Sequence, residues 1–449
     1  MPERNPAARK AAAILKQVAT EKIRFINLQF TDIAGMVKSV TVPATKLPGI
    51  IKSGVWFDGS SIPGFAHIDQ SDMRLKPDID TFRVVPWERG ENTTARLVCN
   101  VLTADGEPFG ADPRQVLIWA LKEAENAGFR FVTAPECEFF LFKLDGGVPT
   151  PHDLAGYRDY ADDGGHEIRK EMANALHDFG IEVEASHHEV AVGQHEISFR
   201  YDDALRTADN TIAFKLTLKA VAQRHGLHAT FMPKPVFGIN GSGMHTNQSL
   251  FGLSTGKNAF YDRKEPNGLS RIARHFIAGQ LAHVRGMSAV LSPLVNSYKR
   301  LVPGYEAPVY ISWGRVNRSA LIRIPRFSPE NTESARIELR CPDPSCNPYL
   351  AFAVMLKCGL EGIREKLEPP PPTDANLYHF DAARLRKENI GTMPGSLGEA
   401  LDELEKDKVV QEALGPHITN WFLKSKRQEY DESRLQVTQW ELDKYLPVY

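Results

Sequence analysis

Carboxylates set within apolar, strand-like segments are the feature that most constrains how this chain can fold. Glu136 and Glu138 stand in Ala-Pro-Glu-Cys-Glu-Phe-Phe-Leu-Phe. Because side chains alternate along a strand, both point the same way as Phe140 and Phe142. Two carboxylates that converge on one buried face need cations beside them, since unpaired buried charge is too unfavourable to persist. The fold must therefore bring positive groups or metal ions to this face.

Four more residues that could bind a metal occur in similar surroundings. Glutamate and a single histidine, without cysteine, favour magnesium or manganese over zinc. Six such ligands could hold two cations if water and substrate oxygens complete each shell, as in phosphoryl-transfer sites. Each glutamate taken alone could instead be an ion-pair partner, but the pairs flanked by Phe and Val favour the metal interpretation. The four residues are Glu189, Glu196, His245 and Glu338.

A set of arginines adds anion-binding capacity in the second half of the chain. The planar guanidinium binds carboxylates and phosphates through two parallel hydrogen bonds. Glu338 and Arg340 are two apart in a predicted strand, so a metal ligand and an anion-binding group share one face. Surface arginines are the alternative for any single member. Together the residues indicate metals, phosphate and an acidic substrate. The set comprises Arg300, Arg318, Arg323, Arg336 and Arg340.

Bulk composition narrows the class of protein. A length of 449 residues exceeds the usual limit for a single core, so two domains are expected. The net charge of −2 argues against nucleic acid or a membrane surface as the main ligand. No apolar stretch is long enough to span a membrane and no signal-peptide core follows Met1, which predicts a cytoplasmic protein. Five widely spaced cysteines without a Cys-x-x-Cys pair predict buried, reduced thiols.

The first hundred residues predict a small α+β domain, 1–104. An amphipathic helix opens it, alternating strands follow, and the Asp-Gly and Pro of 103–108 mark its end. The helix is predicted over 6–20, and the strands over 23–30, 37–42, near 81–86 and over 95–102.

In the second domain, 105–449, the sequence predicts strands that carry the glutamates, and these strands alternate with long helices. Asp112 is a helix N-cap, Pro113 suits the first helical position and Gly128 closes that helix. Further helices are predicted over 169–179 and 204–225, and the proline run at 368–373 excludes regular structure there. Ser396 and Glu399 form a predicted capping box for a helix that ends at Gly415-Pro416.

Several long motifs, in order along nearly the whole chain, resemble glutamine synthetase of the type I class, alpha division. They are Phe57-Asp-Gly-Ser-Ser-Ile, Ser71-Asp-Met, Phe231-Met-Pro-Lys-Pro, Asn240-Gly-Ser-Gly-Met-His, Asn296-Ser-Tyr-Lys-Arg-Leu-Val-Pro-Gly-Tyr-Glu-Ala-Pro and Pro342-Asp-Pro. The resemblance implies an α+β fold with a small N-terminal β-grasp-like domain. It also implies a large catalytic α/β domain whose curved antiparallel sheet forms part of an intersubunit barrel.

The resemblance also implies the reaction and its residues. An ATP-dependent ligase would form glutamine from glutamate and ammonia through γ-glutamyl phosphate, in a homo-dodecamer of two stacked hexamers with sites between subunits. One Mg²⁺ or Mn²⁺ would be held by Glu138, Glu189 and Glu196, and another by Glu136, His245 and Glu338. Glutamate would be bound by Asn240, Gly241, Arg300, Glu306, Arg318 and Arg340. Ammonium would meet Asp58, Asp72 and Glu306, and the catalytic groups would be Asp58, Glu306 and Arg318. ATP would be bound by Glu184, Phe199, Arg200, Tyr201, Ser249, Arg318, Arg323 and Arg336.

Three positions depart from family patterns and bear on regulation. Tyr378 stands in the place of a tyrosine that is adenylylated in the other division, but in surroundings typical of the unmodified one. His67 stands where alpha members often carry an arginine linked to feedback inhibition, and Asn247 replaces a histidine found near the nucleotide in the other division, which fits the alpha assignment. Small regulatory partner proteins are left open.

Two alternatives to glutamine formation remain. One is a relative that joins glutamate to a polyamine or another amine, for which the ammonium site would have to be relaxed; Asp58, Asp72 and Glu306 argue against it. The other, more remote, is a non-catalytic assembly protein, which would have no reason to keep six metal ligands.

Overall fold

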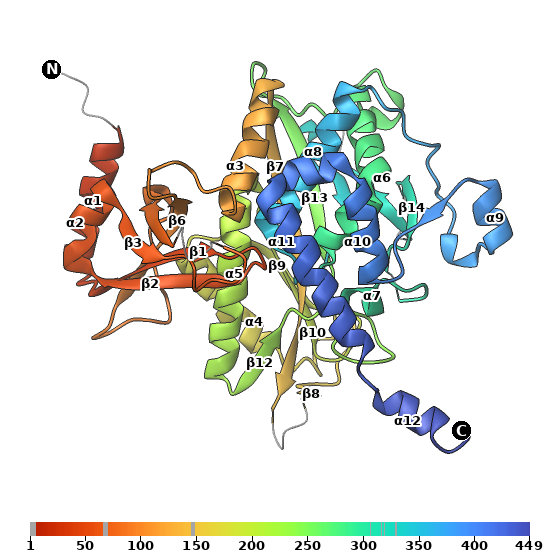
Figure 1. Ribbon diagram of the computed structural model, residues 1–449, viewed down its shortest axis with the longest axis horizontal. Coiled ribbons are helices and arrows are strands. Elements are labelled where there is room, and N and C mark those ends of the chain that lie inside the picture. The colour runs from red at the N-terminus through yellow and green to blue at the C-terminus, as the bar shows by residue number, and fades with distance from the viewer. Residues whose placement is uncertain are drawn as a thin grey trace.

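Two β-sheets of unequal size organise the molecule in a computed structural model. The structure describes residues 6–65, 71–144, 149–305, 307–315, 317, 319–327 and 330–449. The smaller sheet and its two helices form a compact N-terminal unit, on the left in Figure 1, and the larger sheet with most helices lies to the right.

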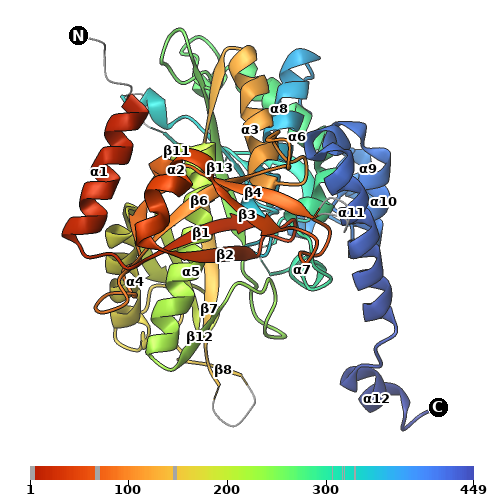
Figure 2. The ribbon, with the colours of Figure 1, turned by 60° about the vertical axis from the view of Figure 1, so that its left-hand side comes forward.

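The N-terminal sheet has the strand order β2-β1-β6-β4-β3, with β5 paired to β6. Strands β1 and β6 are parallel neighbours, whereas the other described pairs in this sheet are antiparallel. Alternation along β1 buries Ile26, Leu28 and Phe30 on one face. Helices α1 and α2 lie beside this sheet (Figure 2). The elements are α1 Pro6–Thr20, β1 Phe25–Thr31, β2 Val37–Pro43, α2 Leu47–Ser53, β3 Val55–Asp58, β4 Asp72–Pro77, β5 Arg83–Val84 and β6 Thr94–Leu102.

The predicted strand near 81–86 is wrong in extent. A short 3₁₀ helix, η3 (Ile79–Thr81), occupies its start, with the Asp78 side chain accepting from the Asp80 amide. Only Arg83–Val84 pairs with β6. An N-cap competes with strand pairing here, because the Asp side chain bonds the local backbone and turns it. The helix 6–20 and the strands at 37–42 and 95–102 are confirmed to within a residue.

The large sheet is curved and mostly antiparallel, and the described residues contribute eleven strands to it. Its main path runs β17-β14-β15-β16-β13-β7-β10-β9, and β8, β11 and β12 pair with the long strand β7. The β14–β15 pair is the parallel exception among the described pairs. The strands are β7 Phe129–Lys143, β8 Thr150–Pro151, β9 Val183–His188, β10 Gln194–Phe199, β11 Asp202–Asp203, β12 Leu227–Thr230, β13 Met244–Gly252, β14 Tyr310–Gly314, β15 Ala320–Arg323, β16 Ile337–Leu339 and β17 Gly391–Thr392.

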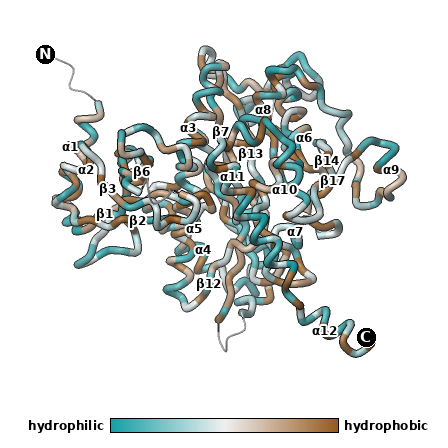
Figure 3. The backbone as a smooth tube through the Cα atoms, viewed as in Figure 1, coloured by the Kyte–Doolittle hydropathy of each residue, from teal (hydrophilic) through white to brown (hydrophobic). Residues whose placement is uncertain are grey.

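Helices cover this sheet and bury its apolar surface. Helices α6 and α8 pack very closely at Gly279. A Cβ added there would lie only 2.1 Å from the Cys358 carbonyl oxygen. Figure 3 shows hydrophobic segments gathered around the covered strands and α8, whereas α9 is mainly hydrophilic. The helices are α3 Pro113–Asn126, α4 His166–Asp178, α5 Ala204–Arg224, α6 Arg271–Leu291, α7 Ser297–Arg300, α8 Pro348–Arg364, α9 Ala382–Lys387, α10 Leu397–Lys406, α11 Lys408–Arg434 and α12 Gln439–Tyr445.

The helix predicted from Ser396 to Gly415 is wrong, because it is divided at Asp407. Asp407 caps the next helix, its side chain accepting from the Val410 amide at 3.1 Å. Gly415 has φ +74° and produces a kink within α11 rather than its end. The capping box is also half formed: Ser396 accepts from Glu399, but the Glu399 carboxylate accepts from the Gly395 amide instead. A polar side chain that can cap a new helix interrupts the backbone there, even where the apolar spacing of one continuous helix goes on.

A buried ion-pair network attaches the N-terminal unit to the large domain. Arg114, at the start of α3, donates to both carboxylate oxygens of Asp209 at 2.9 Å and to Asp78 at 2.7 Å. Tyr349 also donates to Asp209, at 2.8 Å. Because Asp78 belongs to the small unit and Asp209 to α5, these contacts hold the two parts in one orientation.

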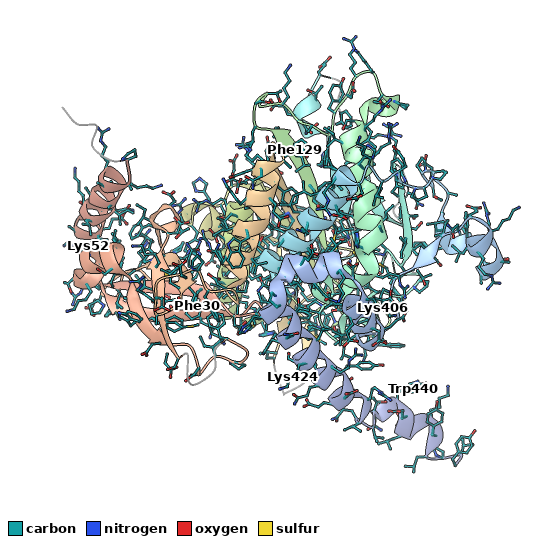
Figure 4. The ribbon with its side chains drawn as sticks, turned by 45° about the horizontal axis from the view of Figure 1, so that its top comes forward. Phe30, Lys52, Phe129, Lys406, Lys424 and Trp440 are labelled. Atoms are coloured by element: carbon teal, nitrogen blue, oxygen red, sulfur yellow. The ribbon has the colours of Figure 1, made fainter. Side chains whose placement is uncertain are left out.

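The remaining features concern the surface and the thiols. Helix α12, which carries Trp440, extends beyond the body of the large domain (Figure 4). None of the helices in the described part of the chain combines the length and apolar character needed to cross a bilayer. All five cysteines are buried free thiols, which confirms that prediction.

Candidate active site

Strand register brings five of the six predicted metal ligands onto four neighbouring strands, β16-β13-β7-β10, and the sixth, Glu189, directly follows β9. Glu138 on β7 pairs directly with Glu196 on β10, and Glu136 pairs with His245 on β13. Glu338 on β16 pairs with Asn247 on β13. Directly opposed side chains on a sheet lie about 5 Å apart, so a carboxylate-rich face forms although the residues are far apart in sequence.

Glu136, His245 and Glu338 form one compact group, as the resemblance implies. One ligand atom from each lies within 4.8 Å of the others. Nδ1 of His245 is 3.9 Å from Glu136 and 3.8 Å from Glu338. Asn247 donates to Glu136 at 2.8 Å, and Arg336 donates to Asn247 at 2.9 Å. The hydrogen bonds orient Glu136 within the group.

The second expected group is arranged differently. Glu189 and Glu196 gather with His187, whose Nε2 is 2.6 Å from the Glu189 carboxylate. Glu138 is held slightly apart by the Gly243 amide at 2.9 Å and by the side-chain amide of Gln194 at 3.0 Å. It still interacts electrostatically with both glutamates. Two clusters with oxygen and imidazole donors therefore lie on one face, and this donor set suits hard divalent cations.

Burial and mutual repulsion make the carboxylates of this face hard to ionise together. Burial, followed by the charge of Glu189, raises the pKa of Glu138 to about 8. Burial, followed by Glu136 and the other glutamates, raises the pKa of Glu196 to about 9. The pKa of Glu136 is also raised, by burial and by Glu338. Concentrated carboxylates of this kind fit a divalent metal, which would replace the protons.

Metal binding should therefore strengthen as pH rises. Glu138 and Glu196 have pKa values raised above the ordinary 4.5, so the folded, metal-free protein holds protons that the unfolded chain has released. Stability without metal then falls as pH rises from about 5 to about 9. We expect Mn²⁺ to raise the unfolding temperature more at about pH 8.5 than at about pH 6. Thermal unfolding with and without metal measures this, and an equal rise at both values would contradict it.

Gln194 helps to orient a glutamate on the carboxylate-rich face. Its buried amide donates to Glu138 at 3.0 Å and to the Gly241 carbonyl at 3.1 Å. We expect Gln194→Leu to weaken metal affinity by about 10- to 100-fold, because partners that orient a ligand typically contribute that much. Titration with Mn²⁺ measures it. Gln280→Met is the control, since Gln280 is equally buried but bonds Gln248 and Met355; equal losses in both variants would exclude a specific role.

Two buried arginines, Arg300 and Arg340, lie next to the carboxylate-rich face. Arg340 is 5% exposed, and its Nε is 3.3 Å from Glu338. Neither Nε nor Nη1 has a hydrogen-bond partner among the described residues, so this guanidinium can bind an anionic substrate group. Arg300 donates to the backbone carbonyls of residues 340–342. A Cβ at Gly243 would lie 2.6 Å from the guanidinium of Arg300, so a larger residue there would displace that side chain.

A cavity of about 340 Å³ opens beside Glu136. Five of the predicted ATP-binding residues line it: Glu184, Phe199, Tyr201, Ser249 and Arg336. Its size and its mixture of aromatic and polar walls suit a nucleotide. The Ser249 hydroxyl, however, is already donated to the Ala335 carbonyl at 2.7 Å.

Other predicted residues lie elsewhere. Arg200 is paired with Glu182 at 3.0 Å on the surface, and Arg323 contacts Glu338 rather than the cavity. Asp58 and Asp72 are cross-strand partners on the N-terminal sheet, exposed to solvent. The Tyr378 hydroxyl donates to the Ala307 carbonyl at 2.8 Å. Glu306, Arg318 and His67 lie outside the described residues.

Several functional neighbours were not predicted from sequence as part of the site. His187, Gln194 and Gln248 belong to the metal and nucleotide surroundings, as do Asn331 and Glu333 in the cavity wall. The sequence held a signal for His187 and Gln194. Each stands two residues before a predicted ligand, and that spacing places two strand side chains on one face.

Comparison with known proteins identifies the fold and family. A family model described as "Glutamine synthetase, beta-Grasp domain" matches residues 22–104, and one described as "Glutamine synthetase, catalytic domain" matches residues 110–445. This chain belongs to the glutamine synthetase family.

Relatives in that family match almost end to end. A glutamine synthetase of Methanosarcina mazei is 51% identical over 96% of this chain and 97% of its own length. One of Thermus thermophilus is 52% identical over 98% of this chain and 99% of its own length. A solved GmaS/ADP complex superposes with a TM-score of 0.87 at 32% identity, covering 96% of this chain and 99% of the other.

Proposed function

We propose that the carboxylate face and the adjoining cavity form the active site of a glutamate–ammonia ligase that uses ATP and divalent metal to make glutamine. The observation that carries this is the pairing of Glu136 with His245 and of Glu138 with Glu196 beside a cavity lined by Arg336 and Tyr201. Full-length relatives about half identical to this chain support the same activity.

The chemistry follows from the poor reactivity of a carboxylate toward ammonia. ATP would lie in the cavity with its phosphates toward Glu136, and glutamate would be oriented by Arg340. Transfer of the γ-phosphoryl group to the substrate γ-carboxylate forms γ-glutamyl phosphate, from which ammonia displaces phosphate. Bound Mg²⁺ or Mn²⁺ would offset the charge of the transferred group. Glu136, His245 and Glu338 would hold one cation, and Glu189, Glu196 and Glu138 the other.

Asp58 would accept the proton that ammonium must lose before it can attack. Hydrogen bonds from the Ser60 hydroxyl and amide lower the pKa of Asp58, so the side chain stays charged at neutral pH. Asp72, its cross-strand partner, would add a second charge that attracts the cation. By resemblance, Glu306 would close the site and Arg318 would bind the phosphoryl group.

The site would be completed between subunits. Asp58 and Asp72 belong to the N-terminal sheet, and neither lines the nucleotide cavity. If they lie opposite the carboxylate-rich face of a neighbouring subunit, residues of two chains form each active site. The assembly would be a dodecamer of two stacked hexamers. The same proposal divides each chain into domains at 1–104 and 105–449, which the two matched regions, 22–104 and 110–445, support.

An amine-acceptor panel tests the activity. With glutamate, ATP and Mg²⁺, ammonia should be used at least about a hundredfold more efficiently than methylamine, ethanolamine or a polyamine. A site built around charged acceptors of N–H groups discriminates strongly against poorly fitting amines. Preference for a substituted amine would favour the amine-ligase alternative. Absence of phosphate release with every amine would overturn the ligase proposal.

A further inference from the structure

A second cavity, of about 350 Å³, lies where the N-terminal unit meets the large domain. The β1–β2 turn forms one wall, and helix α5, residues 230–232 and parts of α6, α8 and α11 form the others. Its volume lies in the range of small-molecule sites, about 300–1,000 Å³. None of the described residues assigned above to metal, glutamate or nucleotide lines this cavity.

Two lysines of α5 line this cavity, and neither forms an ion pair with an acidic side chain in the described part of the chain. Lys215 and Lys219 are one helical turn apart, where like charges repel. Nζ of Lys215 donates to the neutral Cys346 carbonyl at 3.2 Å. Lys219 forms no ion pair with any described residue, and its Nζ lies 5.9 Å from the Phe231 ring. Lys219 is exposed to solvent at this cavity, and partial desolvation together with the neighbouring Lys215 lowers its pKa.

The rest of the wall is largely apolar. Ile212, Leu216, Val290, Leu294 and Phe422 contribute hydrocarbon surface, and Lys426, the third lysine, is already paired with Glu429 at 2.7 Å. Two unpaired ammonium groups beside such a wall match a ligand with a charged head and an apolar body. We propose that this cavity binds a small organic carboxylate, with its carboxylate between Lys215 and Lys219 and its body against the apolar wall.

The cavity adjoins the segments that shape the proposed glutamate site. Phe231 and Met232 precede Pro233, whose carbonyl accepts from the Ser242 amide at 2.8 Å. Pro344 and Ser345 follow Pro342, whose carbonyl accepts from Arg300. A ligand that braces both segments would alter the KM for glutamate more than the KM for ATP. This regulatory consequence rests on the proposed function, whereas binding itself does not.

The binding test uses 3-phenylpropionate, its neutral amide and inorganic phosphate, measured by calorimetry on the full-length protein. The acid should bind about tenfold more tightly than the amide, because charge-assisted hydrogen bonds are stronger than neutral ones. Phosphate alone should bind weakly, since it lacks an apolar body. Lys219→Gln should remove the preference for the acid, and Ala34→Phe, which places a ring in the cavity mouth, should block both organic probes. Lys408→Gln, at an exposed position at the start of α11 that does not line the cavity, is the matched control and should change nothing.

Three outcomes would overturn the carboxylate site. Equal affinity for acid and amide would show that the lysines do not recognise charge. Tighter binding of phosphate than of the organic acid would assign the cavity to inorganic anions. A changed oligomeric state in Lys219→Gln and Ala34→Phe, with no probe binding in the wild type, would assign it to contact with another subunit. Because binding is measured without substrates, failure here leaves the amine-panel result unaffected.

Discussion

Replacing Glu338 with glutamine should lower kcat by about 1,000-fold and weaken binding of one metal ion. Glu338 is 2% exposed and contacts His245, Arg323 and Arg340. Glutamine keeps the shape but removes the charge that a cation needs, and loss of one preorganised electrostatic partner typically lowers rates by about 100- to 1,000-fold. Steady-state kinetics and Mn²⁺ titration of the folded variant measure both effects.

The control for this prediction is Glu182→Gln. Glu182 forms an exposed ion pair with Arg200 at 3.0 Å, and exposed pairs contribute little, so activity should stay within about twofold of wild type. Full turnover of Glu338→Gln without added metal would remove Glu338 from the ligand set. Because Arg323 and Arg340 lose their partner, thermal unfolding must also be followed to separate loss of fold from loss of metal.

Replacing Asp58 with alanine should reduce amide formation by about 100- to 10,000-fold while leaving nucleotide affinity nearly unchanged. The Asp58 side chain is exposed, and it accepts hydrogen bonds only from Ser60 and Ser61 among the described residues. The fold therefore does not depend on it, and the expected loss is that of a general base. Glutamine production and ATP titration measure the two quantities.

Asp105→Ala, in another exposed turn, is the matched control and should behave as wild type. Equal loss of nucleotide binding and amide formation in Asp58→Ala would contradict the assigned role. The shared site can be tested by co-expressing Asp58→Ala with Glu338→Ala. If each site takes Asp58 from one chain and Glu338 from another, random mixing should restore about a quarter of wild-type activity. No recovery in demonstrably mixed oligomers would place both residues in one chain's site.

Local pattern predicted much of the secondary structure and failed where side chains compete for the backbone. The helix 6–20 and the cap at Asp112 were correctly predicted, since propensity and capping act within a few residues. Asp407 caps a helix inside a segment whose pattern indicated one continuous helix, and Asp78 caps a helical turn that overlaps the start of a predicted strand. The short strands β3 and β4 carry Asp58 and Asp72, and their pairing depends on β6, which lies elsewhere in the sequence.

The sequence by itself determined the chemistry of the site. Alternation along β7 placed Glu136 and Glu138 on one face, and residue type alone indicated oxygen-binding metals and anions. The sequence alone did not determine which carboxylates lie close enough to share a cation. Register between β7, β10, β13 and β16 decided that, because hydrogen-bonded pairing brings residues as distant as Glu136 and Glu338 within a few ångströms. Charge coupling weakens with distance and strengthens with burial, so the raised pKa of Glu196 is a property of the assembled sheet and not of any segment.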